Sequence, residues 1–238
     1  MTWRPPFPGF FSLLGLLDRE DWPALVCFLE DRVIKRGRYR PGEVRLLAQA
    51  YLLLGEPLPV LALENGAAAV NPGLLEQCAL LFGAARLLAG DNAGAARFFT
   101  ERESRVRYRD RAWVAWYRGF ALFMDNRYGE AADSFSQSAR GPAEPLCAGL
   151  AAWFLADSLA LILPDRSGEL SRVAGEGRAR ARLRLRGRAA WDRAAGRLRG
   201  GPQGRLRGGP RREFWGLIAG KYLDETASWL YNNHKELH

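Results

Sequence analysis

The stretch RGFALFMDNRYGEAADSF, residues 118–135, decides the fold of this chain. Its apolar residues recur at helical spacing on both sides of Asp125-Asn126, a pair that favours a turn between two helices. Gly119 on the first helix and Ala131 on the second would let the two backbones approach, and a large residue opposite, such as Phe135, would fill the remaining space. The stretch therefore predicts two short antiparallel helices that pack closely.

The same order of small and large residues returns upstream, at spacings of 36 and then 35 residues. The second copy holds Gly83, Gly90, Ala95 and Phe99 at the equivalent places, and the first holds Ala48, Gly55, Val60 and Glu64. A period of this size is typical of stacked helical pairs, in which no pair can bury its apolar face without a neighbour. We therefore expect an array of helical pairs, which more often holds a partner than transforms a substrate.

The repeated segment resembles the tetratricopeptide repeat (TPR) family, whose units place Leu-Gly and Tyr in the first helix and Ala, Phe, Ala and Pro in the second. The third copy matches this pattern best, through Gly119, Leu122, Tyr128, Ala131 and Phe135. The first copy departs from it at Val60 and Glu64, and the second at Arg86 and Arg107. The resemblance implies an all-α fold, a TPR-like right-handed superhelix of antiparallel helical hairpins.

The predicted units lie near residues 5–38, 41–74, 76–109 and 112–145, with an incomplete unit at 148–163. Residues 164–212 form an Arg/Gly-rich segment, and residues 213–238 have the pattern of a C-terminal helix. Repeat arrays need a terminal cap to cover the last apolar face, and this helix is a candidate for that role.

The positive charge of the chain is concentrated in residues 164–212. The whole chain carries +9, whereas this segment alone holds 15 arginines and four acidic residues, a net charge of +11. Its alternating arginines and its Gly-Gly-Pro units predict a flexible segment. Such arginines can contact phosphates of nucleic acid or of an anionic membrane surface; the candidates are Arg178, Arg180, Arg182, Arg184, Arg186 and Arg188. A solvated linker rich in arginine remains the other interpretation.

The resemblance also implies which side chains meet a partner, because the concave surface of such arrays is lined mainly by the first helix of each unit. Carried over to this chain, those places hold Trp113, Trp116, Tyr117, Phe120 and Phe123, with Trp153 nearby and Arg45 and Gln49 upstream. The family's carboxylate clamp needs several cationic and amide side chains, and only Arg45 with Gln49 resembles it. We therefore expect an apolar or amphipathic peptide or helix as the ligand, unless residues 213–238 cover these aromatic side chains.

The sequence offers little for catalysis. The two histidines, His234 and His238, lie in the last five residues, and Cys27, Cys78 and Cys147 lack metal-ligand spacing. We predict no enzymatic activity, no cofactor and no small-molecule substrate. The favoured function is a scaffold or adaptor for protein binding, and the alternative is RNA or anionic-surface binding through residues 164–212.

Two apolar segments bear on localisation. Residues 146–163 contain a single charge, Asp157, but their glycine and serine fit a buried repeat helix better than a membrane span. Residues 10–17 are followed at once by Asp18-Arg19-Glu20-Asp21 without a small-residue cleavage site, which argues against export. We expect a cytoplasmic protein with reduced cysteines.

Overall fold

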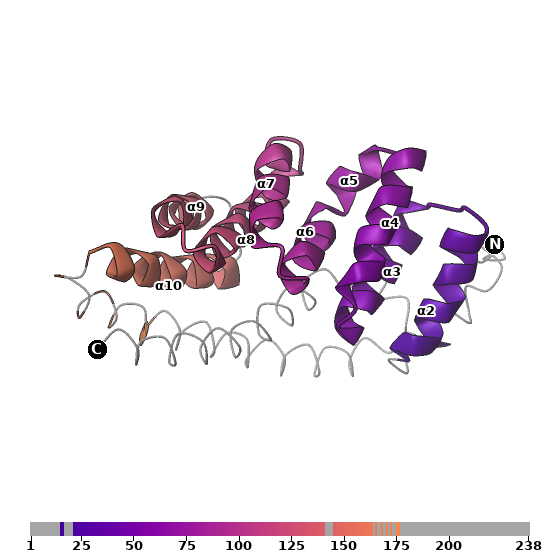
Figure 1. Ribbon diagram of the computed structural model, residues 1–238, viewed down its shortest axis with the longest axis horizontal. Helices are drawn as coiled ribbons and strands as arrows, with labels where there is room; N and C mark the ends of the chain where they lie inside the picture. Colours follow the sequence, from indigo (N-terminus) through magenta and orange to yellow (C-terminus); the bar gives the residue numbers. More distant parts are fainter. Residues whose placement is uncertain are drawn as a thin grey trace, which may run out of the picture. The chain divides into compact units, whose positions relative to one another are not determined.

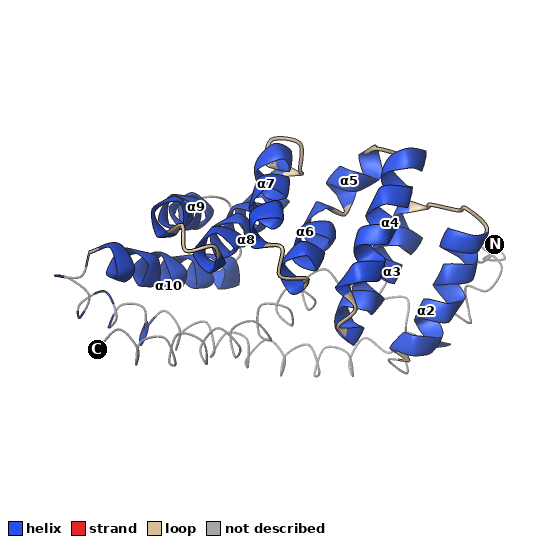
Figure 2. Cartoon of the chain, viewed as in Figure 1, coloured by secondary structure: helices blue, strands red, loops and turns tan. Residues whose placement is uncertain are grey.

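The computed structural model describes residues 21–140 and 145–163, together with residues 15, 16, 165, 168, 170, 172, 175 and 176. The regular structure of these residues is helical, and none of them belongs to a strand (Figure 2). The chain divides into two units, Met1–Ala181 and Arg182–His238, and every residue described here belongs to the first. The predicted all-α class is confirmed for the described residues.

The helices follow one another along the chain as labelled in Figure 1. They are α2 (Trp22–Glu30), the π-helical turn η1 (Asp31–Lys35), α3 (Pro41–Leu54), α4 (Pro57–Val70), α5 (Gly73–Gln77), α6 (Ala79–Leu88), α7 (Asn92–Arg102), the 3-10 turn η2 (Tyr108–Asp110), α8 (Arg111–Met124), α9 (Tyr128–Arg140) and α10 (Pro145–Ile162). Three pairs are formed by chain neighbours, α3 with α4, α6 with α7 and α8 with α9. Each pair also packs on the next element, through α4 with α6, α7 with α8 and α9 with α10.

A residue with left-handed backbone closes the turn inside each of the three pairs. Gly55 and Gly90 both have φ +78°, and Asn126 has φ +60°. The residue after each of them donates its backbone N–H to a carbonyl five residues back, at 2.9 Å in all three turns. This bond is the Schellman closure that satisfies a carbonyl left free at a helix end. The sequence period of 35 and 36 residues is therefore the period of these turns.

Within two of the pairs, a phenylalanine of the second helix lies against a glycine of the first. A Cβ atom added to Gly83 would stand 2.0 Å from Cζ of Phe99, and one added to Gly119 would stand 2.8 Å from Cε1 of Phe135. Both phenylalanines are fully buried. The close approach predicted from the small residues is present, and the phenylalanine ring fills the space at the glycine.

The second pair differs from a simple two-helix unit because its first helix is broken. Cys78, with φ −113° and ψ 12°, separates α5 from α6. Leu74 of α5 and Ala79 of α6 are both buried. In one continuous helix these positions, five residues apart, would point about 140° away from each other. The break lets both side chains reach the core.

The departures from the repeat pattern at Glu64 and Arg86 compensate each other. Arg86 donates from Nη1 to Oε2 of Glu64 at 2.6 Å and from Nη2 to Oε1 at 3.2 Å. The guanidinium carbon also lies 4.3 Å from the centre of the Phe98 ring. Glu64 is on α4 and Arg86 on α6, so this two-pronged ion pair joins the first helical pair to the second.

Polar contacts likewise hold α2 and η1 on α3. The Tyr51 hydroxyl donates to Oε1 of Glu30, and the buried Arg32 donates from Nη2 to Oε1 of Glu43 at 2.8 Å. Burial, and then the hydrogen bond to Glu30, raises the pKa of Tyr51. The phenol therefore stays protonated and able to donate at neutral pH.

Several predicted segments lie outside the described residues. These are the apolar stretch 10–17 apart from residues 15 and 16, all but six residues of 164–212, and the whole of 213–238. Among the helices that the structure describes, α10 included, none has both the length and the apolarity that crossing a membrane requires. The side chain of Cys27 is exposed, whereas Cys78 and Cys147 are buried.

The glycine contacts predict the effect of single alanine substitutions on stability. Gly83→Ala is expected to lower the free energy of unfolding by about 1–3 kcal/mol because Phe99 must move inside a packed core. Gly119→Ala is expected to cost less, since its contact is longer. The control is Gly149→Ala in α10, where nothing lies within 4 Å and alanine should stabilise the helix by about 0.5–1 kcal/mol. Urea denaturation measures the free energy of unfolding of all three variants. Equal changes in Gly83→Ala and Gly149→Ala would contradict the close contact between Gly83 and Phe99.

The Glu64–Arg86 ion pair predicts strong coupling in a double-mutant cycle. Glu64→Gln and Arg86→Met should each destabilise the protein, because each leaves the partner without its counter-charge in a largely buried place. The double variant should lose less than the two single losses combined, with a coupling energy of about 1–3 kcal/mol. The exposed pair Arg127–Glu130 is the control and should couple much more weakly, since solvent screens it. Additive effects at 64 and 86 would rule out the pair as a link between units.

Candidate functional site

Large aromatic side chains gather where α8 meets α10. We call this group the aromatic cluster; it consists of Trp113, Trp116, Tyr117, Phe120 and Phe123 of α8 with Trp153 and Phe154 of α10. All seven side chains are buried. Helix α10 packs on both α8 and α9, which places its rings against those of α8. The cluster contains six of the eight residues that the sequence assigned to the binding groove.

Trp116 lies at the centre of the α8 part of the cluster. Its ring stacks on Phe120, with centroids 5.5 Å apart and planes inclined by 13°. It meets Tyr117 edge to face at 4.8 Å and Trp113 edge to face at 6.0 Å. Offset-stacked and edge-to-face geometries are the favourable ones for aromatic pairs. The rings on α8 are therefore mutually oriented and not merely adjacent.

Phe154 links the two helices, and the sequence prediction missed it. Its ring meets Trp116, Phe120 and Phe123 edge to face, at 5.8, 5.5 and 5.7 Å. The centroid of the Phe154 ring also lies 4.8 Å from that of Trp153 and 5.4 Å from that of Phe135 on α9. The sequence signal was the run Trp153-Phe154 in an apolar helix, but only the packing of α10 on both α8 and α9 shows that Phe154 contacts rings of both helices.

The indole N–H of Trp116 is a buried polar group inside the cluster. This nitrogen is buried and has no hydrogen-bond acceptor among the described residues. Buried indoles usually donate, and a buried donor without an acceptor costs about 1–3 kcal/mol. A ligand oxygen placed next to Trp116 would remove that cost.

The remaining predicted groove residues lie elsewhere. Arg45 and Gln49 are on α3, which packs on α2, α4 and α6. Gln49 is buried and its Oε1 has no hydrogen-bond donor among the described residues, whereas Arg45 is half-buried. The structure therefore does not gather these two residues with the aromatic cluster. The assignment of all eight residues to a partner-binding groove stays a prediction.

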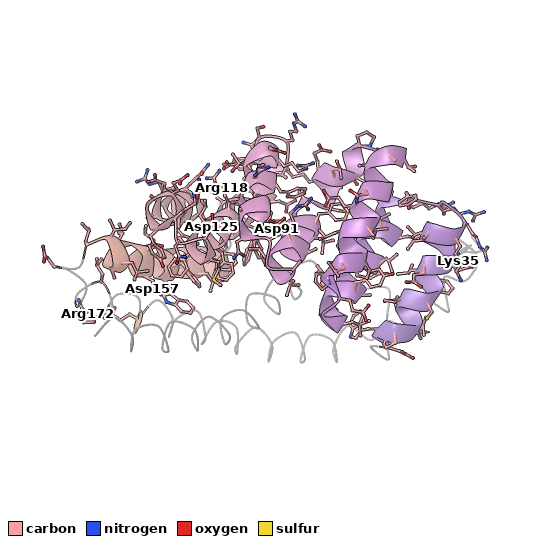
Figure 3. All side chains as sticks on the ribbon, viewed as in Figure 1. Lys35, Asp91, Arg118, Asp125, Asp157 and Arg172 are labelled. Carbon is pink, nitrogen blue, oxygen red and sulfur yellow. The ribbon has the colours of Figure 1, made fainter. Side chains whose placement is uncertain are left out.

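A polar network fixes the other side of α8. Arg118 donates to Ser134 at 2.9 Å and to Gln137 at 2.6 Å, both on α9, and it pairs with Glu103 at the end of α7. Figure 3 labels Arg118 among the side chains of this region. Two residues apart on a helix, Arg118 and Trp116 point about 160° away from each other. The network thus sets the rotation of α8, and with it the direction of the aromatic cluster.

Other polar groups beside the cluster have structural partners. The Tyr128 hydroxyl donates to Oδ1 of Asn126 at 2.7 Å, its ring lies 5.3 Å from Phe123, and burial raises its pKa. The buried Ser138 hydroxyl donates to the Ala112 carbonyl at 2.8 Å. Within the residues that the structure describes, no three His, Cys, Asp or Glu side chains could hold a metal ion together. His234, His238 and the predicted polyanion contacts Arg178–Arg188 lie outside those residues.

The comparisons with known proteins identify a family. Residues 59–201 match the family described as "Uncharacterised Treponema protein". The chain is also 30% identical over 154 residues to an uncharacterised protein of Treponema pallidum (strain Nichols). The aligned part is 65% of this chain and 48% of that protein, so the chain spans about half the length of the curated relative. No solved structure matches the chain.

These matches correct the assignment to the TPR family, which is wrong. The family match runs from α4 through α10 and into the Arg/Gly-rich segment, and it is a match to a different family. The assignment failed because small residues at a close approach and glycine at a helix end are needed wherever helical pairs stack tightly. Such positions indicate the packing and not the ancestry. The family match covers more than half of the residues of this chain, so the chain belongs to the family of uncharacterised Treponema proteins.

Proposed function

We propose that this protein is a scaffold or adaptor that binds a peptide or helix of another protein at the aromatic cluster, without catalysing a reaction. The observation that carries the proposal is the indole N–H of Trp116, a buried donor with no acceptor among the described residues, in the middle of oriented aromatic rings. Aromatic anchors supply much of the binding energy where a helix or peptide enters an apolar groove. A partner carbonyl oxygen would accept from Trp116. A cytoplasmic location belongs to the same proposal.

The cluster is buried in this conformation, so binding must include an opening step. A partner would have to replace part of the packing around Trp116 and Phe154 with its own apolar side chains. This exchange requires little free energy when the partner's side chains restore the lost contacts, because the aromatic rings are out of water in both the free and the bound protein. The partner that fits is therefore an amphipathic helix or peptide with large apolar side chains on one face.

We also propose that the helical pairs stack as a right-handed superhelix, which would place α3, α6 and α8 along one surface. The support is that α6 packs on both α3 and α8, and that each of the three helices ends in the same left-handed turn. Stacks of this kind have an extended surface on which a partner helix can lie.

Spin-label distances test the stacking. With exposed Cys27 replaced by serine, labels go on Gly42 near the start of α3, on Arg111 at the start of α8 and on Asp125 just after its end. Parallel first helices require the distance from Gly42 to Arg111 to be shorter than that from Gly42 to Asp125. The reverse order of distances would show that α3 and α8 do not run side by side in the same direction.

The second candidate function is RNA or anionic-surface binding through residues 164–212. It rests on the net charge of +11 in this segment, part of which lies inside the family match. Deletion of residues 164–212 should abolish this binding and leave peptide binding at the aromatic cluster intact. Salt separates the two as well, since phosphate binding falls steeply with ionic strength and apolar binding does not.

Peptide selection tests the proposed site. A display library of amphipathic helical peptides is selected against the full chain, and the recovered peptide is measured by calorimetry. Trp116→Phe keeps an aromatic ring at this place, although a smaller one, and removes the donor, so we expect affinity to fall about 3–10-fold. The free protein should lose less stability than the cavity left by the smaller ring would cost, because an unsatisfied buried donor is removed as well. Trp22→Phe on α2 is the matched control. Unchanged affinity in Trp116→Phe, or failure to select any peptide, would refute the site.

A further inference from the structure

The pattern Arg-x-Arg-Tyr-Arg occurs twice in this chain. It is found at residues 36–40, as RGRYR, and at residues 105–109, as RVRYR. Both copies lie directly before the first helix of a helical pair, the one before α3 and the other at η2 and α8. The equivalent connection before α6, residues 71–78, holds no arginine or lysine. The pattern is thus a property of two particular loops and not of every connection in the array.

The first arginine loop, residues 35–40, presents its charges to solvent from a fixed backbone. Lys35, Arg36, Arg38 and Arg40 are all exposed. Figure 3 labels Lys35 at the end of η1. Gly37, with φ +62°, lets the chain turn between the two pairs of basic residues. The half-buried Tyr39 anchors the loop on α4, because its hydroxyl would stand 2.3 Å from a Cβ added to Gly66.

The second arginine loop, residues 104–111, is anchored by a different side chain. Val106 is buried between Arg105 and Arg107, which are both exposed. Tyr108 is 68% exposed, and the guanidinium of Arg111 lies 6.0 Å from the centre of its ring. Arg111 also donates to the Ser104 carbonyl at 3.2 Å, which closes the loop. This loop therefore offers cations and an open aromatic face together.

Several acidic residues near the two loops have ion-pair partners, of which one, Arg36, belongs to a loop. Glu43, just inside α3, pairs with buried Arg32, and Asp31 pairs with Arg36. Beside the second loop, Glu103 pairs with Arg118 and Glu101 with Arg102. Within the described part of the chain, no ion pair forms at the exposed cations Lys35, Arg38, Arg40, Arg105 and Arg107. Both loops also lie at helix N-termini, whose dipoles add to the positive potential.

We propose that the two arginine loops form a binding site for single-stranded nucleic acid. Guanidinium groups bind phosphate oxygens in pairs, and an aromatic ring between them can stack on an unpaired base. The exposed ring of Tyr108 favours this ligand over a lipid surface, because the aliphatic residue of the second loop, Val106, is buried and unable to insert into a membrane. A duplex hides its base faces and would not use Tyr108. The site is separate from the aromatic cluster and does not depend on it.

A single site made of both loops rests on the proposed parallel stacking of α3 and α8. They precede α3 and α8, and both of these helices pack on α6. A strand that contacts both loops gains affinity from the second contact without a second association step. The loss of either loop should therefore weaken binding strongly.

The test measures fluorescence anisotropy of a labelled oligouridylate with the full chain over a series of salt concentrations. Two variants alter the loops, Arg38→Gln with Arg40→Gln and Arg105→Gln with Arg107→Gln. The control, Arg97→Gln with Arg140→Gln, removes the same charge from exposed places on α7 and α9. Residues 164–212 are unchanged in all three variants, so any binding through them is the same in each. Each loop variant should bind about tenfold more weakly than the control and lose about one unit of salt slope for each arginine in contact with phosphate.

Tyr108 distinguishes nucleic acid from other polyanions. Tyr108→Ala should weaken oligouridylate binding by about tenfold, whereas Tyr108→Phe should bind like the unaltered chain. Circular dichroism melts confirm that each variant is folded. The proposal is overturned if both loop variants bind like the control, or if Tyr108→Ala binds like Tyr108→Phe. It is also overturned if vesicles containing phosphatidylglycerol, and not the oligouridylate, show the dependence on the loops.

Discussion

The rest of this structure depends on the close approach of two helices at a glycine. At Gly83 and Gly119 a phenylalanine ring from the second helix occupies the volume where a side chain would otherwise begin. The approach is possible because the turn between the helices is short and closed by a residue that tolerates positive φ. Close packing within each pair then leaves one apolar face on the outside, which the next helix must cover. The order of the helices along the chain follows from this requirement.

Polar side chains decide how the pairs are joined. The ion pair of Glu64 and Arg86 spans α4 and α6, and the network around Arg118 ties α7, α8 and α9 together. These contacts are directional, so they fix the rotation of each helix, which apolar burial alone leaves loose. By orienting α8, the Arg118 network turns Trp116 and Phe120 toward α10. The aromatic cluster is thus built by polar contacts on the opposite side of the same helix.

Prediction from the sequence succeeded for features that depend on one residue or on its neighbours along the chain, such as the ends of helices. The helix ends at Gly55, Gly90 and Asn126 follow from the tolerance of glycine and asparagine for positive φ, which is a property of the single residue. Prediction from the sequence failed for contacts between residues that are far apart along the chain. Glu64 and Arg86 each looked like a defect in a repeat, because neither residue indicates its partner 22 positions away. The family assignment failed for a related reason, since the requirements of helix packing are common to many lineages.

The sequence by itself determined the helical class, the period of the helical pairs and most members of the aromatic cluster. The reason is that the hydrophobic period and the preference for a turn depend on residues that are neighbours along the chain. Only the tertiary structure decided that the Phe154 ring joins α10 to α8, and that the Trp116 indole N–H is buried without an acceptor among the described residues. It also decided that Arg36, Arg38, Arg40, Arg105 and Arg107 stay exposed, whereas Val106 is buried and Tyr39 half-buried. The physical reason is that burial is a relation between segments. A residue's own type limits what it can contact, but the packing of other helices decides whether it reaches water.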